Sequence, residues 1–164
     1  MKPPKFDYIR VENSEEALDL LSEYGDDAKI IAGGQSLMPM LNMRLVRPQV
    51  LIDITNAQDL YGITQTSDAI EIGATTTQAD LGNWKGLALN LPLLAAAMPS
   101  IGHFQTRNRG TVCGSLCHAD PSSELPTCLM LLDGEVELKN KKSTRKVKAD
   151  DFLIGVLTAA KHAD

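Results

Sequence analysis

The chain has 164 residues, of which 43% are hydrophobic and 23% charged, a composition typical of a globular protein with one domain or two small lobes. Its formal net charge of −5 disfavours nucleic acid and acidic membrane surfaces as partners, because both require a basic surface. No apolar run approaches the roughly 20 residues that cross a bilayer, and no apolar stretch follows the basic N-terminus as in a signal peptide. We therefore expect a soluble cytoplasmic protein without a membrane span.

The first 56 residues alternate between strand and helix patterns. Residues 6–10 form the first expected strand, and Ser14 is expected to cap a helix whose apolar positions have helical spacing and which ends at Gly25. A strand, a helix-like segment and another strand are expected next, at residues 28–31, 37–44 and 49–54. This βαβαβ order predicts a short parallel sheet with right-handed crossovers.

The pattern changes after Asn56, where short strands mix with apolar helices. The basic run at residues 139–142 is predicted to be a solvated hairpin tip rather than a binding patch. The other expected elements are antiparallel strands at 60–64 and 69–73, a helix from 77, a buried helix at 92–98, a core segment at 125–132 and hairpin strands at 135–138 and 146–148. The sequence predicts an α+β fold with two lobes, residues 1–56 and 57–164, that share one cleft.

Three cysteines, Cys113, Cys117 and Cys128, are an odd number in a chain without a signal peptide, which indicates free thiols in a reducing compartment. The spacing of Cys113 and Cys117, with His118 beside them, invites a metal or iron–sulfur interpretation. That interpretation lacks a second pair of ligands, so we expect ordinary thiols and no metal site.

Two glycine-bearing segments are small enough for backbone amides to approach a phosphate. Residues 32–36, Ala-Gly-Gly-Gln-Ser, lie where a predicted strand gives way to a helix, and residues 111–115 read Thr-Val-Cys-Gly-Ser. Neither segment has the spacing of a Rossmann site or a P-loop. A strand followed by a tight turn and a helix N-terminus forms an anion-binding site. Two such segments suggest a bound dinucleotide. For the Gly33-Gly34 pair alone, a plain turn is an open alternative.

Residues 29–54 and 101–133 closely resemble the FAD-binding medium subunit of the molybdenum hydroxylases, whose members include carbon monoxide dehydrogenase and the nicotine, xanthine and hydroxybenzoyl-CoA enzymes. The similarity extends to residues 6–8, 72–76 and 151–155, and so covers nearly the whole chain. The resemblance implies a two-lobed FAD-binding domain of the vanillyl-alcohol oxidase or PCMH type, with FAD between the lobes.

The resemblance also implies which residues surround FAD. Asp120 matches the family's acid at the ribose or adenine end, with Glu124 a weaker candidate, although Asp120 also suits a turn cap before Pro121. The remaining implied residues are Ala32, Gly33, Gly34, Gln35, Ser36 and Leu37 on one side, Thr111, Val112, Cys113, Gly114 and Ser115 on the other, and Ala74, Thr75 and Thr76 in the surround.

Other polar residues near the second segment receive structural roles. Arg107, Asn108 and Arg109 resemble phosphate clamps, but we expect them to fix the loop by bonding backbone carbonyls or carboxylates. His103 has no Ser-His-Asp set or paired carboxylates around it, so we expect a packed or surface histidine and no catalytic residue in the chain.

The function implied by the resemblance is electron transfer: FAD passes electrons from a partner iron–sulfur small subunit to an external acceptor, while a molybdopterin large subunit oxidises the substrate. The chain is then one subunit of a hetero-oligomer. A non-catalytic assembly module that keeps the fold without productive flavin is the alternative, and a stand-alone FAD-linked oxidase would need a substrate domain for which this chain has no room.

Two departures from the family pattern matter. Cys113 replaces the second glycine of the family's Thr-Ile-Gly-Gly, which would cost on the order of 1 kcal/mol if that position needed a positive φ. The chain also stops at Asp164, where family members continue into a C-terminal domain, so a fragment or a truncated gene product is expected.

Overall fold

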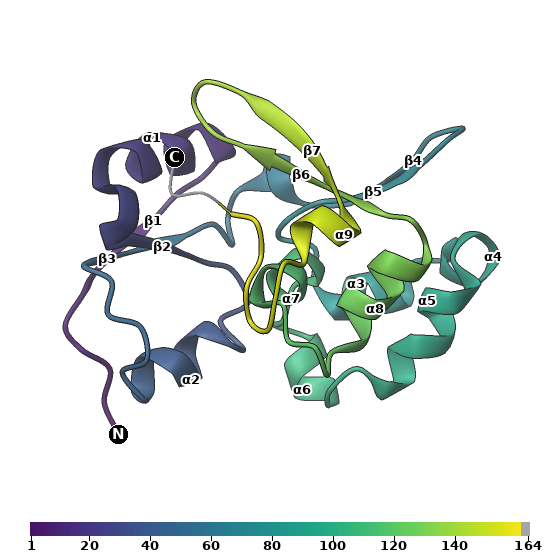
Figure 1. The fold of residues 1–164 in the computed structure, drawn as a ribbon, viewed down its shortest axis with the longest axis horizontal. Helices are drawn as coiled ribbons and strands as arrows, with labels where there is room; N and C mark the ends of the chain where they lie inside the picture. The colour runs from purple at the N-terminus through teal and green to yellow at the C-terminus, as the bar shows by residue number, and fades with distance from the viewer. Residues whose placement is uncertain (162–164) are drawn as a thin grey trace.

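The computed structural model describes residues 1–161 (Figure 1). Strands β1 (Asp7–Arg10), β2 (Ala28–Ile31) and β3 (Val50–Asp53) form a parallel sheet in the order β1-β3-β2. The register aligns Arg10 of β1 and Ile31 of β2 with Asp53 of β3. The carboxyl ends of the three strands therefore meet at one edge, as the predicted βαβαβ order requires.

Helix α1 (Ser14–Tyr24) packs on one face of this sheet. The prediction that Ser14 caps it was wrong, because Asn13 has the extended backbone of a cap residue and its side chain accepts a hydrogen bond from the Glu16 amide at 2.9 Å. Ser14 is the first helical residue, and its own amide donates to Asp59. The predicted end is confirmed, since Gly25 adopts a positive φ of 52° there.

A first core cluster fills the space between α1 and the sheet. All four residues of β3 are buried because it is the central strand, and Val50 and Ile52 pack with Ala17 of α1. The cluster also contains Ala57, and the partly buried Leu60 and Ala74 pack against it. The core of the first lobe thus reaches past residue 56, while α2 (Leu37–Asn42) lies on the other side of the sheet in Figure 1.

The remaining chain is mostly short helices with two small antiparallel sheets. Strands β4 (Ile63–Gln65) and β5 (Ile70–Ile72) form one sheet, β6 (Glu135–Lys139) and β7 (Thr144–Lys148) the other, as expected from the sequence. The helices are α3 (Gln78–Asn83), α4 (Leu87–Asn90), α5 (Pro92–Ala97), α6 (Phe104–Arg107), α7 (Val112–His118), α8 (Glu124–Leu131) and α9 (Ala149–Phe152), with short 3-10 turns at Gly25–Asp27, Gln58–Leu60 and Met98–Ser100.

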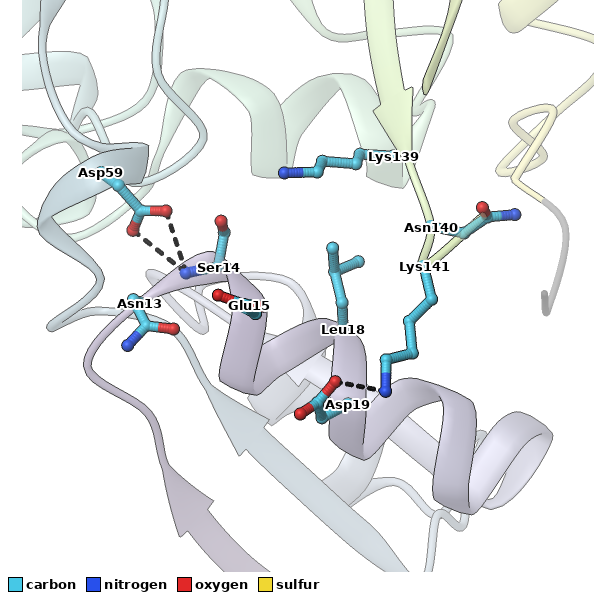
Figure 2. A pocket seen from close by; sticks show the side chains of 9 residues that line it. All are labelled: Asn13, Ser14, Glu15, Leu18, Asp19, Asp59, Lys139, Asn140 and Lys141. Atoms are coloured by element: carbon cyan, nitrogen blue, oxygen red, sulfur yellow. Dashed lines mark hydrogen bonds and ion pairs between the residues drawn. The ribbon is translucent and has the colours of Figure 1, made fainter. Parts of the chain in front are cut away.

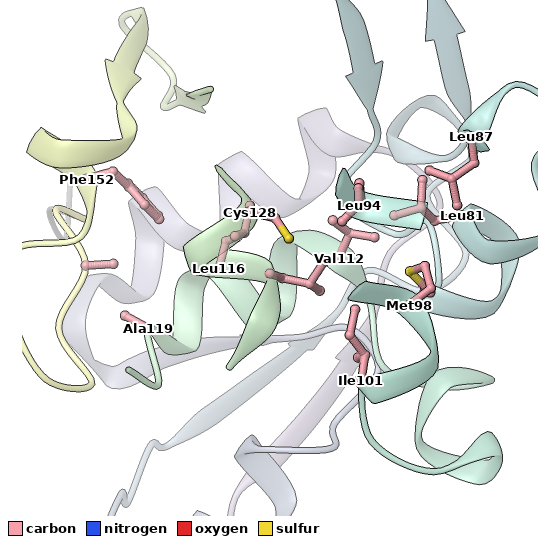
Figure 3. Packing of buried hydrophobic residues seen from close by; sticks show 12 residues of the cluster. Leu81, Leu87, Leu94, Met98, Ile101, Val112, Leu116, Ala119, Cys128 and Phe152 are labelled. Atoms are coloured by element: carbon pink, nitrogen blue, oxygen red, sulfur yellow. The ribbon is translucent and has the colours of Figure 1, made fainter. Parts of the chain in front are cut away.

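A second core cluster joins these helices (Figure 3). Phe152 of α9 is fully buried, and Cys128 of α8 packs in the same cluster. The expectation that residues 125–132 are core holds only for one face of α8, because Met130, Leu131 and Leu132 are exposed. The helix predicted at 92–98 is likewise buried only in part, with Leu94 inside and Leu93 at the surface.

The basic run at residues 139–142 lies at the tip of the β6–β7 hairpin, as predicted. The Asn140 side chain accepts hydrogen bonds from the amides of Lys142 and Ser143 and so closes the turn. The α+β prediction is confirmed. No helix among residues 1–161 is long and apolar enough to cross a membrane.

Replacing Phe152 with alanine should lower the free energy of unfolding by about 3–5 kcal/mol, because the change leaves a cavity in the second core cluster. Urea unfolding followed by circular dichroism measures the loss. The matched control is Phe104→Ala, which removes a ring that is 68% exposed and should change stability by less than about 0.5 kcal/mol. Equal losses in the two variants would contradict this account of the core.

Candidate functional site

A cleft of about 970 Å³ lies at the carboxyl edge of the parallel sheet. Residues from both predicted lobes line it: Tyr8, Ile31 and Asp53 from the sheet, and Thr75 and Thr111 from the later part of the chain. Its volume lies at the upper end of the range of small-molecule sites. The cleft is therefore the candidate binding site.

The loop that follows β2 forms one wall of the cleft, and each of its glycines has its own reason to be there. Gly34 has a φ of 70°, a conformation that side chains rarely adopt. A Cβ on Gly33 would lie 1.9 Å from the carbonyl oxygen of Arg109, so glycine is required for the close approach of two chain segments. The plain-turn alternative explains Gly34 but not Gly33, because the obstacle at Gly33 is backbone from the opposite wall.

The amides of residues 33–36 donate no hydrogen bond to any protein atom within residues 1–161. The carbonyl groups of this loop are used instead: Gly34 accepts from the Met38 amide at 3.0 Å, and Gly33 accepts from the Gln35 side chain at 3.1 Å. A run of free amides beside a cleft is suited to an anionic ligand.

The opposite wall contains Thr111, which is the N-cap of α7 rather than part of an open loop. Its hydroxyl accepts a hydrogen bond from the Gly114 amide at 3.0 Å, and a Cβ on Gly114 would lie 2.6 Å from that hydroxyl oxygen. Cys113 is helical and has no positive φ, so the expected strain at this departure from the family pattern does not arise. The Ser115 hydroxyl lies 3.1 Å from that of Ser123.

Thr75 and Thr76 differ although they are neighbours and both buried. The Thr76 hydroxyl donates to the Gly62 carbonyl and accepts from the Gly62 amide, each at 2.9 Å. Thr75 lines the cleft, and its buried hydroxyl has no partner among the described residues. A buried polar group without a partner is costly, so Thr75 is the member of the pair that is available to a ligand.

The structure brings six of the implied residues to the cleft surface, and the others are not in the lining. The lining residues are Ala32, Gly33, Gly34, Gln35, Thr75 and Thr111. Asp120 is not in the lining, and hydrogen bonds from the Ser122 amide and hydroxyl to its side chain lower the pKa of Asp120. The other implied residues that are not in the lining are Ser36, Leu37, Ala74, Thr76, Val112, Cys113, Gly114 and Ser115.

The polar residues just before the second segment also divide into one with structural contacts and two that line the cleft. The Arg107 guanidinium donates to the carbonyls of Ile101 and Gly102 at 2.8 and 2.9 Å, which is the predicted scaffold role. Asn108 and Arg109, expected to share that role, line the cleft. His103 is exposed at the surface. This was one of the two expected alternatives, a packed or a surface histidine.

A polar network on the sheet was missed by sequence reasoning. The Tyr8 hydroxyl and the Arg10 guanidinium both donate to one oxygen of Asp53, while Thr55 donates to the other through its amide and its hydroxyl. Burial opposes ionisation of Asp53, but the hydrogen bonds from Tyr8 and Thr55 and the charge of Arg10 outweigh it and lower its pKa. Strand alternation places Tyr8 and Arg10 on one face; only the strand order brings Asp53 beside them.

The cysteines that invited a metal interpretation form no such site among the described residues. Cys113, Cys117 and Cys128 are free, and no cluster of three metal-binding side chains occurs within residues 1–161. Burial, with a smaller effect of Cys117, raises the pKa of Cys113 to about 12, so it stays a neutral thiol.

A smaller depression of about 420 Å³ lies between α1 and the β6–β7 hairpin (Figure 2). Lys141 pairs with Asp19 across it, and Lys139 extends from the hairpin over its floor. Both partners of the ion pair are about half exposed, and such pairs contribute little to stability. The depression contains no unpaired buried group, so the larger cleft remains the candidate site.

Comparison with known proteins gives consistent matches over nearly the whole chain. The model of the family described as "FAD binding domain in molybdopterin dehydrogenase" matches residues 4–164. The 6-hydroxypseudooxynicotine dehydrogenase complex subunit alpha of Paenarthrobacter nicotinovorans is 47% identical over 94% of this chain and 52% of its own length. The nicotine 6-hydroxylase medium subunit of the same organism is 42% identical over all of this chain and 58% of its own length.

Solved structures agree. A carbon monoxide dehydrogenase chain from Hydrogenophaga pseudoflava superposes with a TM-score of 0.95 at 37% identity, covering 99% of this chain and 57% of that one. Quinoline 2-oxidoreductase from Pseudomonas putida 86 gives the same TM-score and coverage at 35% identity. The chain thus spans a little over half the length of the relatives it matches.

Replacing Asp53 with asparagine should reduce stability at pH 7, and the difference from wild type should shrink as the pH falls. The folded-state pKa of Asp53 lies below the ordinary value of 3.8, so its contribution is present above pH 3.8 and is lost as the pH falls through the lower folded value. Urea unfolding of both proteins between pH 7 and pH 3 measures this. A constant difference over that range would contradict the prediction, and Asp68→Asn, in an exposed turn, is the control.

Proposed function

The chain belongs to the family of FAD-binding domains in molybdopterin dehydrogenases, and from this premise we propose that it is the FAD-binding part of a molybdenum-containing hydroxylase or dehydrogenase. In this role it takes electrons from a partner iron–sulfur subunit and passes them through FAD to an external acceptor. The observation that carries the proposal is the row of free amides at residues 33–36 beside the cleft, in a chain that matches this family over nearly its full length.

The residues present fit FAD. The free amides of residues 33–36 suit the pyrophosphate, and the unpartnered Thr75 hydroxyl provides a further polar contact from the opposite lobe. The Gly33 contact with Arg109 brings the two walls together, so that a ligand at this loop would meet both. We assign the pyrophosphate to this place and retain the implied set from Ala32 to Leu37, Ala74 to Thr76, Thr111 to Ser115, and Asp120 as the proposed FAD surround.

The side chains in the cleft indicate which chemical steps we assign to this chain and which to FAD and the partner subunits. FAD supplies the redox chemistry when bound, and a protein that carries a flavin needs to bind and orient it. The titratable side chains of the lining are Tyr8, Arg10, Asp53, Tyr61 and Arg109, and Asp53 is tied to Tyr8 and Arg10. We assign no acid or base step to this chain, and we place substrate oxidation in a molybdopterin large subunit.

The names of the relatives support a multi-subunit assembly. One relative is a complex subunit alpha of 6-hydroxypseudooxynicotine dehydrogenase, one is a medium subunit of nicotine 6-hydroxylase, and one is a medium chain of carbon monoxide dehydrogenase. We propose a hetero-oligomer with an iron–sulfur small subunit and a molybdopterin large subunit. The free thiols support a reducing compartment, and we propose the cytoplasm. We also propose the division into lobes at residues 1–56 and 57–164, with Ala57, Leu60 and Ala74 of the second lobe packing against the core of the first.

The first test is cofactor binding. FAD should bind saturably and more tightly than FMN, because the free amides can bind two phosphates and FMN has one. Quenching of flavin fluorescence during titration of the purified chain measures both affinities. A folded chain that binds neither flavin, or binds the two equally, would overturn the proposal.

The second test uses Gly33→Ala. The added Cβ collides with the Arg109 carbonyl and must push the two walls apart, so FAD affinity should fall by at least about tenfold, with a lower melting temperature. The matched control is Gly155→Ala, where the nearest atom to a new Cβ is 3.8 Å away and φ is not positive. Unchanged FAD affinity in Gly33→Ala would show that the contact between the walls is not part of the site.

A further inference from the structure

Basic side chains gather around the loop that follows α2, although the chain as a whole is acidic. Residues 1–6 and 28–52 contain five lysines and arginines and no aspartate or glutamate, in a chain with a formal net charge of −5. Four of these cations are exposed and form no ion pair within residues 1–161: Lys2, Lys5, Arg44 and Arg47. Together with Met43 and Leu45 they form what we call the basic loop surface.

The segment before β1 and the loop between α2 and β3 lie side by side (Figure 1). Nε of Arg44 donates to the carbonyl of Lys2 at 3.5 Å, and the Asp7 amide donates to the carbonyl of Gln49 at 2.8 Å. The cations of the two segments therefore belong to one surface. Asp7 lies at the end of this surface next to the sheet, as does Asp27, whose carbonyl accepts from the Gln49 amide at 2.8 Å. The end next to α2 is the basic one.

Arg44 occupies a backbone position that favours glycine. The Leu45 amide donates to the Met40 carbonyl and the Arg44 amide to the Leu41 carbonyl, each at 2.9 Å, which is the hydrogen-bond pattern of a Schellman helix end. Arg44 is the left-handed residue of this turn, with a φ of 59°. Glycine adopts that conformation freely, whereas a residue with a Cβ is strained in it. A strained residue whose charged side chain has no ion pair in the protein indicates a role for that side chain in binding.

Two exposed apolar side chains flank Arg44. Met43 is 51% exposed and Leu45 is 66% exposed. Methionine and arginine are both enriched in protein–protein interfaces. An anionic membrane would also attract the cations, but it would repel the rest of the chain, which is acidic. A partner protein can contact the basic loop surface alone, so the charge distribution favours an acidic protein as the occupant.

The basic loop surface begins where the lining of the cleft ends. Met38, Pro39 and Asn42 of α2 line the cleft, and Met43 is the next residue along the chain. A protein bound to this surface would therefore lie beside the α2 wall of the cleft. An electron donor has to come close to the cofactor, and this position brings it close without filling the cleft.

We propose that the basic loop surface is the docking site of the iron–sulfur subunit that supplies electrons to FAD. The proposal rests on the proposed function above. The sulfide and thiolate ligands of an iron–sulfur cluster carry more negative charge than its iron ions balance, and reduction adds to that charge. Complementary charges steer the encounter of two proteins, so a basic surface beside the cleft favours the approach of a reduced iron–sulfur subunit.

Charge reversal tests the docking. Arg44→Asp combined with Arg47→Glu should weaken binding of the separately produced iron–sulfur subunit by about tenfold or more, mainly through slower association. Aspartate is among the residues that tolerate a positive φ at position 44. The matched control, Lys146→Glu with Lys148→Glu, makes the same change of charge type on the exposed face of β7 and should leave docking unchanged. Biolayer interferometry on the FAD-loaded chain measures both, and wild-type docking should weaken as salt is added.

Two further substitutions separate docking from folding. Arg44→Gly removes the strain at the positive φ, so the melting temperature should not fall, while docking should weaken by about threefold or more. A role of Arg44 in folding alone predicts the reverse, a lower melting temperature with unchanged docking. Leu45→Ser should also weaken docking by about threefold or more. Its control is Leu89→Ser on α4, which removes a side chain that is 86% exposed.

Flavin reduction reports whether the docking is productive. The FAD-loaded chain is mixed with the iron–sulfur subunit that dithionite has reduced beforehand, and bleaching of the flavin absorbance is followed. Two electrons from reduced clusters and two protons from water reduce each FAD. The charge-reversal variant should bleach more slowly than wild type at low concentrations of the subunit and at the wild-type rate at saturation, because only the encounter is changed.

The outcomes separate the two proposals. A wild-type chain that fails to bind FAD overturns the proposed function together with this inference. FAD binding without binding of the iron–sulfur subunit, or docking that the charge reversal leaves unchanged, overturns the inference alone. Vesicles that contain phosphatidylserine should not bind the chain, and binding that the charge reversal abolishes would assign the surface to a membrane instead. Concentration-dependent dimerisation of the wild-type chain, lost on charge reversal, would assign it to a second copy.

Discussion

The close approach of Gly33 to the Arg109 carbonyl is the contact on which the site depends. It joins the loop that follows β2 to a segment more than seventy residues further along the chain. That segment is held from behind, because the Gln78 amide donates to Gly110 at 2.8 Å and the Val112 amide donates to Thr76 at 3.1 Å. The first loop therefore contacts a wall that backbone hydrogen bonds within the protein hold in place.

Most of the fold could be predicted from local pattern, because strand and helix periodicities and turn residues act over a few positions. The alternation before Asn56 indicated the parallel sheet, and Gly25 indicated the end of α1. Local pattern could not decide which residue caps α1, because Asn13 and Ser14 are both good caps. The choice depends on Asp59, whose carboxylate accepts a hydrogen bond from the Ser14 amide. Burial of α5 and α8 was overestimated because an apolar run does not reveal which face meets the core.

The two glycine-bearing segments indicated by the sequence lie on two walls of the cleft, but the sequence did not indicate which of their residues line it. Short polar residues in a motif can hold a ligand or hold the wall that faces it, and the sequence pattern is the same in both cases. The hydroxyls of Thr76 and Thr111 make hydrogen bonds inside the protein, whereas the buried hydroxyl of Thr75, a lining residue, has no partner among the described residues. The Tyr8–Asp53 contact spans 45 positions and depends on strand order, so no local signal could reveal it.

The charges in the cleft explain how an acidic protein can attract a dinucleotide. The chain carries a formal net charge of −5, yet the charged side chains that line the cleft are two arginines and one aspartate. Asp53 is neutralised by Arg10, and the Arg109 guanidinium has no ion pair or hydrogen bond within residues 1–161. The charged side chains of the lining therefore leave one net positive charge, and the unpaired Arg109 lies on the wall that contacts the loop of residues 33–36, although the chain as a whole is acidic.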